Sequence, residues 1–176
     1  MKKFELTSDL ITNIFGTKLF RIKALIEFGN VKAGELGGFT EKEENLSQDG
    51  NAWVYDNARV YGDACVYGDA RVCDNARVYG NAWVYGDACV CGDACVYGDA
   101  CVYGDAGYAT VHGFGSEYRT TTFFKTKAGD IGVKCGCFYG NLSEFRKKVV
   151  ETHGETKKAK EYLMLADLME FRLTHK

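Results

Sequence analysis

One six-residue motif, repeated without insertion, fills the middle of this chain. It reads Asn or Asp, Ala, any residue, Val, Tyr or Cys, then Gly or Asp, and it starts ten times in succession between Asn51 and Asp105. Self-similarity at a short fixed period is typical of solenoids, in which each unit buries its apolar face against its neighbours. The repeat therefore decides the architecture, and the flanking segments are best understood as additions to it.

A period of six residues predicts a parallel β-helix with three flat sides and about eighteen residues per turn. The Val of each hexad points inward and the Ala fits the crowded corner. The turn falls where Gly or Asp precedes Asn or Asp, because these residues accept left-handed backbone conformations at low cost. Coils about 4.8 Å apart make residues 51–106 a rod of three coils, about 14 Å long. The usual handedness of parallel crossovers would favour a right-handed coil.

Residues eighteen apart form columns on the outside of this rod. Two sides carry unbroken tyrosine columns, Tyr61/Tyr79/Tyr97 and Tyr67/Tyr85/Tyr103. Stacked rings stabilise neighbouring strands by about 0.2–1 kcal/mol per pair. An aromatic side on a thin rod would also suit a subunit interface. Both interpretations stay open.

The first side of the rod differs from the other two. Asp56 and Asp74 replace the Gly found at the other corners, and cysteines replace tyrosines in its columns, which are Trp53/Arg71/Cys89 and Tyr55/Cys73/Cys91. This side is either a solvent face or a ligand face. The repeat cysteines are expected to be outward-facing free thiols in a reducing compartment; they are Cys65, Cys73, Cys89, Cys91, Cys95 and Cys101.

The flanks divide the chain into three parts. Residues 1–50 are expected to form an N-terminal cap, with strands at 4–6 and 18–25 and a degenerate first coil over 28–50, because a solenoid must cover its terminal core. Residues 51–106 are the β-helix. Residues 107–176 are expected to form a β-β-α-α block, with strands at 119–125 and 131–138 and helices beginning near 141 and 156. The fold class is thus mainly β.

The helices of this block have predictable apolar faces. In the first, Phe145, Val149 and Val150 are expected to face inward until Gly154 ends the helix. The residues expected to face inward in the second are Ala159, Tyr162, Leu163, Ala166, Leu168, Met169 and Leu173. The block is too small to stand alone comfortably, so we expect it to pack on the rod end or on a neighbouring subunit.

Charge and composition exclude some partners. A net charge of −2 and a pI near 5.9 lack the basic excess that duplex nucleic acid or an anionic membrane surface requires. No stretch approaches the ~20 apolar residues of a membrane span, and the first residues lack the apolar core of a signal peptide. A cytoplasmic location is expected.

The stretch from residue 108 to 122 gathers hydroxyl groups, glycine amides and one arginine. These are donors that a phosphate site uses, and the aromatic residues here can stack on a base or a nicotinamide-like ring. The predicted ligand-binding residues are Tyr108, Phe114, Ser116, Tyr118, Arg119, Thr120, Thr121 and Thr122. The run of threonines is equally ordinary β-strand composition.

Other reactive residues give weaker signals. Cys135 and Cys137 point the same way on a strand, but a structural zinc site usually needs four ligands, so plain thiols are expected there. No metal and no other cofactor is predicted. His112, just past the last hexad, is the candidate general base if the protein is an enzyme; otherwise it is a surface histidine near a change of fold.

The ends of the chain resemble a known group of proteins. Residues 28–58, FGNVKAGELGGFTEKEENLSQDGNAWVYDNA, look like the entry segment of uncharacterised bacterial and phage-borne hexapeptide-repeat proteins, which are often called transferases on fold alone. The C-terminal block, GSEYRTTTFFKTKAGDIGVKCGCFYGNLSEF followed by THGETKKAKEYL, is similar to a tail found in several phage or prophage members. The resemblance implies a left-handed β-helix and a homotrimer, and it brings no agreed catalytic residues.

Three functions follow from these observations as hypotheses. The leading one is a non-enzymatic oligomer that binds a small phosphorylated or nucleotide-like ligand and, given the phage resemblance, sequesters a host immune nucleotide signal in the host cytoplasm. The second is an acyltransferase of the hexapeptide class, acting on a small amine or sugar with His112 as base. The third is a structural or protein-interaction module.

Overall fold

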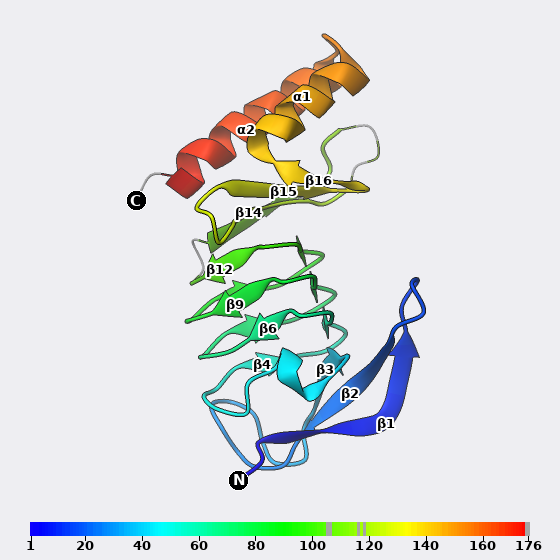
Figure 1. Cartoon of the computed structure of the whole chain (residues 1–176), viewed down its shortest axis with the longest axis vertical. Helices are drawn as coiled ribbons and strands as arrows, with labels where there is room; N and C mark the ends of the chain where they lie inside the picture. Colours follow the sequence, from blue (N-terminus) through cyan, green and yellow to red (C-terminus); the bar gives the residue numbers. More distant parts are fainter. Residues whose placement is uncertain (105–106, 116, 118, 175–176) are drawn as a thin grey trace.

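The computed structural model describes residues 1–104, 107–115, 117 and 119–174. They form three parts stacked along one axis (Figure 1): an N-terminal antiparallel sheet, a β-solenoid, and a C-terminal antiparallel sheet followed by two helices. The predicted mainly β fold is confirmed as a β-solenoid of about four turns with a β cap at one end and a β and α block at the other.

The solenoid has the three predicted sides. Each side is a parallel sheet in which residues eighteen apart are paired, as in Arg59 opposite Arg77 and Trp83 opposite Cys101. The first side contains β4 (Trp53–Val54), β7 (Arg71–Val72) and β10 (Cys89–Val90). The second contains β5 (Arg59–Val60), β8 (Arg77–Val78) and β11 (Cys95–Val96), and the third β6 (Cys65–Val66), β9 (Trp83–Tyr85) and β12 (Cys101–Tyr103).

The core of the rod is the column of Val and Ala that the repeat predicts. Every Ala and Val of the hexads from Ala52 to Val102 is buried. At the corners the backbone takes positive φ, with glycine at most of them and with Asp56 at 53° and Asp74 at 59° on the first side. The turn assignment is confirmed, since aspartate is one of the few residues that adopts this conformation without large strain.

A further coil precedes the regular repeat, as expected for residues 28–50. Strand β3 (Leu36–Thr40) pairs in parallel with β5, Phe39 lying opposite Arg59, and Leu46 bridges Val66 on the third side. A short 3₁₀ helix, η1 (Glu43–Asn45), forms the corner between them. A side chain at Gly38 would place its Cβ 2.6 Å from the carbonyl oxygen of Ala58. This coil therefore needs glycine at position 38, where its backbone packs closely against the next coil.

The N-terminal cap is a long hairpin of β1 (Phe4–Thr12) and β2 (Lys18–Ala24) that joins the second side of the rod through β3. Phe4 of the hairpin and Phe28, which follows β2, close the core: both meet the Trp53 ring edge-on, at centroid distances of 6.1 and 5.4 Å. Trp53 is fully buried, so its expected place in an outward column is corrected. The outer end of the hairpin rises beside the rod (Figure 1).

The C-terminal sheet covers the other end of the rod, in the order β13 (Tyr108–Val111), β14 (Thr121–Lys125), β15 (Ile131–Cys135) and β16 (Phe138–Asn141). The hairpin between β14 and β15 was predicted; β13 and β16 were not, and the β-β-α-α description is corrected to four strands and two helices. Phe124 joins the solenoid core and Phe123 the core under the helices. The expected packing on the rod end is confirmed.

Two helices cover the outer face of this sheet. Helix α1 (Leu142–His153) begins with the predicted capping box of Asn141 and Glu144 and ends at Gly154, with φ of 57°. Val150 is 52% exposed, contrary to expectation. In α2 (Lys157–Thr174) the inward face is Ala159, Tyr162, Leu165, Ala166, Met169 and Leu173. Leu168 is 55% exposed and Leu165 takes its place inside.

None of the helices in the described residues has both the length and the apolar character needed to cross a bilayer.

Candidate functional site

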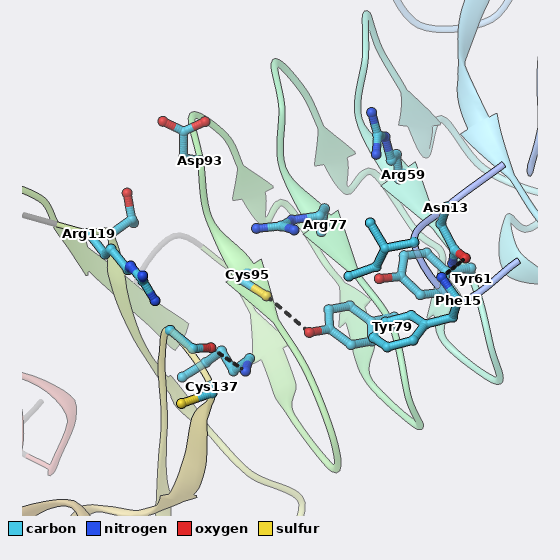
Figure 2. Close-up of a pocket in the computed structure, with 14 residues that line it drawn as sticks. Asn13, Phe15, Arg59, Tyr61, Arg77, Tyr79, Asp93, Cys95, Arg119 and Cys137 are labelled. Carbon is cyan, nitrogen blue, oxygen red and sulfur yellow. Dashed lines mark hydrogen bonds between the residues drawn. The ribbon is translucent and has the colours of Figure 1, made fainter. Parts of the chain in front are cut away.

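A groove of about 710 Å³ lies beside the second side of the rod (Figure 2). Three separate parts of the chain form its walls: the tip of the N-terminal hairpin, three coils of the rod, and the C-terminal sheet with the segment leading to it. The lining residues are Asn13, Ile14, Phe15, Arg59, Tyr61, Arg77, Tyr79, Asp93, Cys95, Arg119, Thr120, Lys134, Gly136 and Cys137.

The rod contributes an arginine column and a tyrosine column. Arg59 and Arg77 are paired residues on adjacent parallel strands. Beside them the rings of Tyr61 and Tyr79 stack with centroids 4.7 Å apart and planes 8° from parallel. The repeat thus presents two cations and two stacked aromatic rings on one flat surface.

The arginines of this column are not neutralised by neighbouring carboxylates. Within the ranges that the structure describes, neither Arg59 nor Arg77 forms an ion pair, and like charges directly opposite each other on paired strands repel. Four basic side chains line the groove against the single carboxylate of Asp93, a net charge of +3. The groove is therefore cationic on a protein whose overall charge is −2.

The C-terminal wall adds two further cations. Arg119 is exposed and its guanidinium lies 3.7 Å from the carboxylate of Glu117. Lys134 donates a hydrogen bond to the carbonyl of Gly136, at 2.7 Å. Figure 2 shows Arg119 on the wall facing Arg77 across the hollow. An exposed ion pair of this kind contributes little stability, so Arg119 can exchange Glu117 for a stronger anion.

The hairpin tip forms an apolar wall of the groove. The side-chain oxygen of Asn13 accepts hydrogen bonds from the backbone amides of Phe15 and Thr17, both at 2.9 Å, which fixes the turn. Ile14 and Phe15 at the tip are 91% and 75% exposed. Large apolar side chains presented to solvent in this way commonly mark a binding surface.

The tyrosine hydroxyls of the groove stay protonated at neutral pH. Burial raises the pKa of Tyr61 to about 12. Burial and the hydrogen bond with Cys95, whose Sγ lies 3.5 Å from the Tyr79 hydroxyl, also raise the pKa of Tyr79. Neutral hydroxyls beside guanidinium groups can donate hydrogen bonds to an anion without opposing its charge.

Of the eight predicted ligand-binding residues, the structure brings Arg119 and Thr120 into this groove. Tyr108 lies on the first side of the rod, where its hydroxyl donates to the Cys89 carbonyl at 2.7 Å. Phe114 is 39% exposed beside α2, and its carbonyl accepts a hydrogen bond from Tyr162. Ser116 and Tyr118 lie outside the described residues.

Thr121 and Thr122 belong to β14 and are 1% and 0% exposed. Thr122 accepts a hydrogen bond from the amide of Cys95 at 3.0 Å, and Thr121 donates to the sulfur of Cys135 at 3.1 Å. The Thr122 hydroxyl joins the C-terminal sheet to the rod, the Thr121 hydroxyl joins two strands within that sheet, and neither residue has surface to offer a ligand. Cys95, expected on the outside, is 9% exposed because this strand covers it.

Of His112, Cys135 and Cys137, only Cys137 lines the groove. His112 is exposed, with Nδ1 3.0 Å from the hydroxyl of Thr120. Cys135 contacts the Thr121 hydroxyl and Tyr162, whereas Cys137 is exposed and faces the groove. Cys135 and Cys137 are free thiols in the structure, and no His or carboxylate joins them in a cluster among the described residues.

The protein is a β-solenoid with a groove that is bounded by its two caps and by the second side of the rod. The family model for the YdcK β-solenoid repeat matches residues 52–68 and 70–86, so these hexads are similar to that repeat. A comparison with curated proteins gives no match. The likeness supports the solenoid and carries no information on transferase activity.

Proposed function

We propose that this protein binds a small phosphorylated or nucleotide-like ligand in the groove between the hairpin tip, the second side of the rod and the C-terminal sheet. The observation that carries the proposal is the convergence of Arg59, Arg77 and Arg119 on one hollow. Guanidinium groups match phosphate oxygens in a fixed fork geometry, so three of them from two walls form a suitable receptor for an anion with more than one phosphate.

The arginine pair on the rod gives the proposal its energetic basis. Arg59 and Arg77 repel each other on adjacent strands, and this cost is offset when an anion lies between or above them. The solenoid core holds the two strands in place whether or not the ligand is bound, so the site is organised in advance and little ordering cost remains at binding.

Shape and lining favour a small ligand with a ring. A groove of about 710 Å³ is in the usual range of small-molecule sites. Ile14 and Phe15 on one side and the edges of the stacked Tyr61 and Tyr79 rings on another offer apolar contact to a base or ribose. The biological role would be sequestration of a host immune nucleotide signal, a step that rests on the resemblance of both chain ends to phage-borne proteins.

Isothermal titration calorimetry with the full chain tests the proposal. The panel consists of cyclic mononucleotides and dinucleotides, ADP-ribose derivatives and inorganic pyrophosphate. Arg77→Ala and Arg119→Ala should each abolish the heat of the ligand that binds, because either change removes one of the converging cations. The matched control is Arg71→Ala, which removes an exposed arginine from the same hexad position on the first side of the rod.

Two results would reject the proposal. One is the absence of heat with every member of the panel; the other is unchanged affinity in Arg77→Ala and Arg119→Ala.

A homotrimer, which the tyrosine columns and the resemblance both suggest, remains a prediction. Sedimentation of the protein with and without the ligand tests the oligomeric state in the same samples.

The contact between His112 and Thr120 supports acyl transfer as a second candidate. A histidine 3.0 Å from a hydroxyl at the edge of a cationic groove has the reach of a general base. Release of thiol from acetyl-CoA in the presence of small amines or sugars, lost in His112→Ala, would favour this function. Activity that persists in His112→Ala would remove His112 as the base.

A further inference from the structure

Three cysteine side chains form a cluster on the first side of the rod, away from the arginine groove. The Sγ atoms of Cys73, Cys89 and Cys91 all lie within 4.8 Å of one another. Cys89 and Cys91 flank the inward Val90 and so share the outer face, and Cys73 lies on the adjacent coil, its amide donating to the Val90 carbonyl at 2.9 Å. The ladder of the solenoid fixes this arrangement.

The surroundings of the cluster come from the C-terminal block. Tyr108 donates its hydroxyl to the carbonyl of Cys89 at 2.7 Å and accepts from the amide of Cys91 at 3.3 Å. A hollow of about 520 Å³ opens beside these two cysteines and is lined on its far side by Met169 and Arg172 of α2. Two of the three cysteines, Cys89 and Cys91, therefore line a partly enclosed space.

We propose that Cys73, Cys89 and Cys91 form a three-coordinate thiolate site for a soft monovalent metal ion of the Cu(I) class. Thiolate and thioether sulfur select soft ions, and the cluster contains three sulfurs and no nitrogen or carboxylate ligand. A hard cation such as Mg²⁺ or Ca²⁺ would find none of the oxygen ligands that it prefers among these three side chains.

The geometry is close to that of a trigonal site. With metal–sulfur distances of about 2.3 Å, three sulfurs around one ion lie about 4 Å from each other. The separations of up to 4.8 Å therefore shorten by less than about 1 Å on binding, which small rotations about the side-chain bonds provide. The backbone does not have to move.

The charge balance is also favourable. Binding replaces three S–H bonds by three S–Cu bonds, releases three protons to solvent and changes no oxidation state, so the complex carries a charge of −2. Arg71 lies opposite Cys89 in the strand ladder, and Arg172 lines the same hollow; both offset that charge. Asp74 opposes it, but its carboxylate is engaged by the amide of Gly92 at 2.9 Å.

A cysteine binds the metal through its thiolate, so each ligand must lose its proton when the ion binds. Because the metal must displace protons, its apparent affinity should rise with pH. This dependence separates thiolate coordination from adsorption of the ion to carboxylates, which are already ionised at neutral pH.

Competition with a chromophoric Cu(I) chelator under anaerobic, reducing conditions tests the site on the full chain. The wild type should retain one Cu(I) per chain and show a thiolate-to-copper charge-transfer band in the ultraviolet. Cys73→Ser and Cys91→Ser should each weaken retention by more than the ~10–100-fold that loss of an outer-shell partner costs a metal site. Cys65→Ser, a change on the third side at the hexad position that Cys89 occupies in the cluster, should retain the ion like the wild type.

Several outcomes would overturn the site. The chelator could remove all copper from the wild type, or Cys65→Ser could lose the ion as readily as Cys91→Ser. Thermal melting followed by circular dichroism checks the fold of each variant. If Cys73→Ser does not fold, Cys91→Ser decides alone, because Cys91 is exposed and its replacement leaves the core intact.

Discussion

Phe123 and Phe124 are consecutive residues of one strand, fully buried in two different cores. Phe124 closes the end of the solenoid core, whereas Phe123 packs under the two helices, with its ring 5.9 Å from that of Phe145. Strand β14 therefore connects the two cores by the ordinary alternation of a β-strand. The C-terminal block serves as the cap that a solenoid needs at its terminal coil.

Phe124→Ala should lower the free energy of unfolding by about 3–5 kcal/mol, because it removes a fully buried ring from the end of the rod. Urea unfolding followed by circular dichroism measures the change. Phe123→Ala is the matched control for the other core and should cost a similar amount. A loss below about 1 kcal/mol in Phe124→Ala would mean that the strand does not seal the solenoid.

Arg77→Gln should leave the free energy of unfolding within about 0.5 kcal/mol of the wild type or raise it, because the change removes repulsion from Arg59 at an exposed position. Melting temperature and calorimetry on the same sample separate stability from binding. The expected pattern is lost ligand heat with unchanged or higher stability. A clear loss of stability would show that Arg77 supports the fold and that the arginine column has a structural purpose.

Gly92→Asp should be tolerated, whereas Gly80→Asp should destabilise. Both glycines have positive φ, 67° and 75°, at equivalent corners, but a Cβ at Gly92 meets open space and one at Gly80 lies 2.8 Å from the amide nitrogen of Gly98. Asp74 already occupies the corner below Gly92 at φ of 59°. The free energies of unfolding of the two variants, measured in urea, should therefore differ clearly. Equal losses would show that backbone conformation alone determines which residues these corners accept.

The stability of the N-terminal cap should depend on pH through Lys3. The Lys3 ammonium donates hydrogen bonds to the carbonyls of Gly50 and Ala52, and burial lowers its pKa to about 8 from 10.5. Above pH 10.5 the amine is neutral in both states and the burial cost is absent; as the pH falls through 8 the folded state must accept the charge. The unfolded state binds more protons in this window, so stability rises with pH across it.

Comparison with Lys3→Met isolates this effect from the tyrosines and cysteines that titrate in the same range. The difference in free energy of unfolding between wild type and Lys3→Met should move in favour of the wild type from pH 8 to pH 10.5. A difference that is flat over this range would contradict a lowered pKa for Lys3.

The hexads determine the solenoid so fully that its sides, core and corners follow from the sequence. In the hexads, the repeat period and the residue type at each position determine the backbone locally. The two ends of the chain are harder to predict because they depend on contacts between distant segments. Trp53 was placed outside by its column, but the cap of Phe4 and Phe28 encloses it, a contact between distant segments. Strands β13 and β16 escaped prediction because each is only four residues long and is defined by its partner more than by its own pattern.

The candidate groove was predicted only in part for the same reason. Arg119 and Thr120 were named from local composition, and Arg59 and Arg77 lie eighteen residues apart, so the period places them in one column. Whether these residues meet in one groove depends on where the hairpin tip and the C-terminal sheet lie relative to the rod. No local sequence pattern specifies those positions. The cysteines of the first side were likewise recognisable as a column, yet their approach to Tyr108 requires the folded C-terminal sheet.

The hairpin starts from the first coil and the C-terminal sheet covers the last, so the number of coils between them fixes the distance across the groove. Inserting or deleting eighteen residues in register would move Arg119 relative to Phe15 by one strand spacing, about 4.8 Å, and add or remove one rung of the arginine and tyrosine columns. Under the proposed function, coil number would therefore set ligand size in discrete steps, and one coil more would accommodate a longer anion along one additional rung of the same columns.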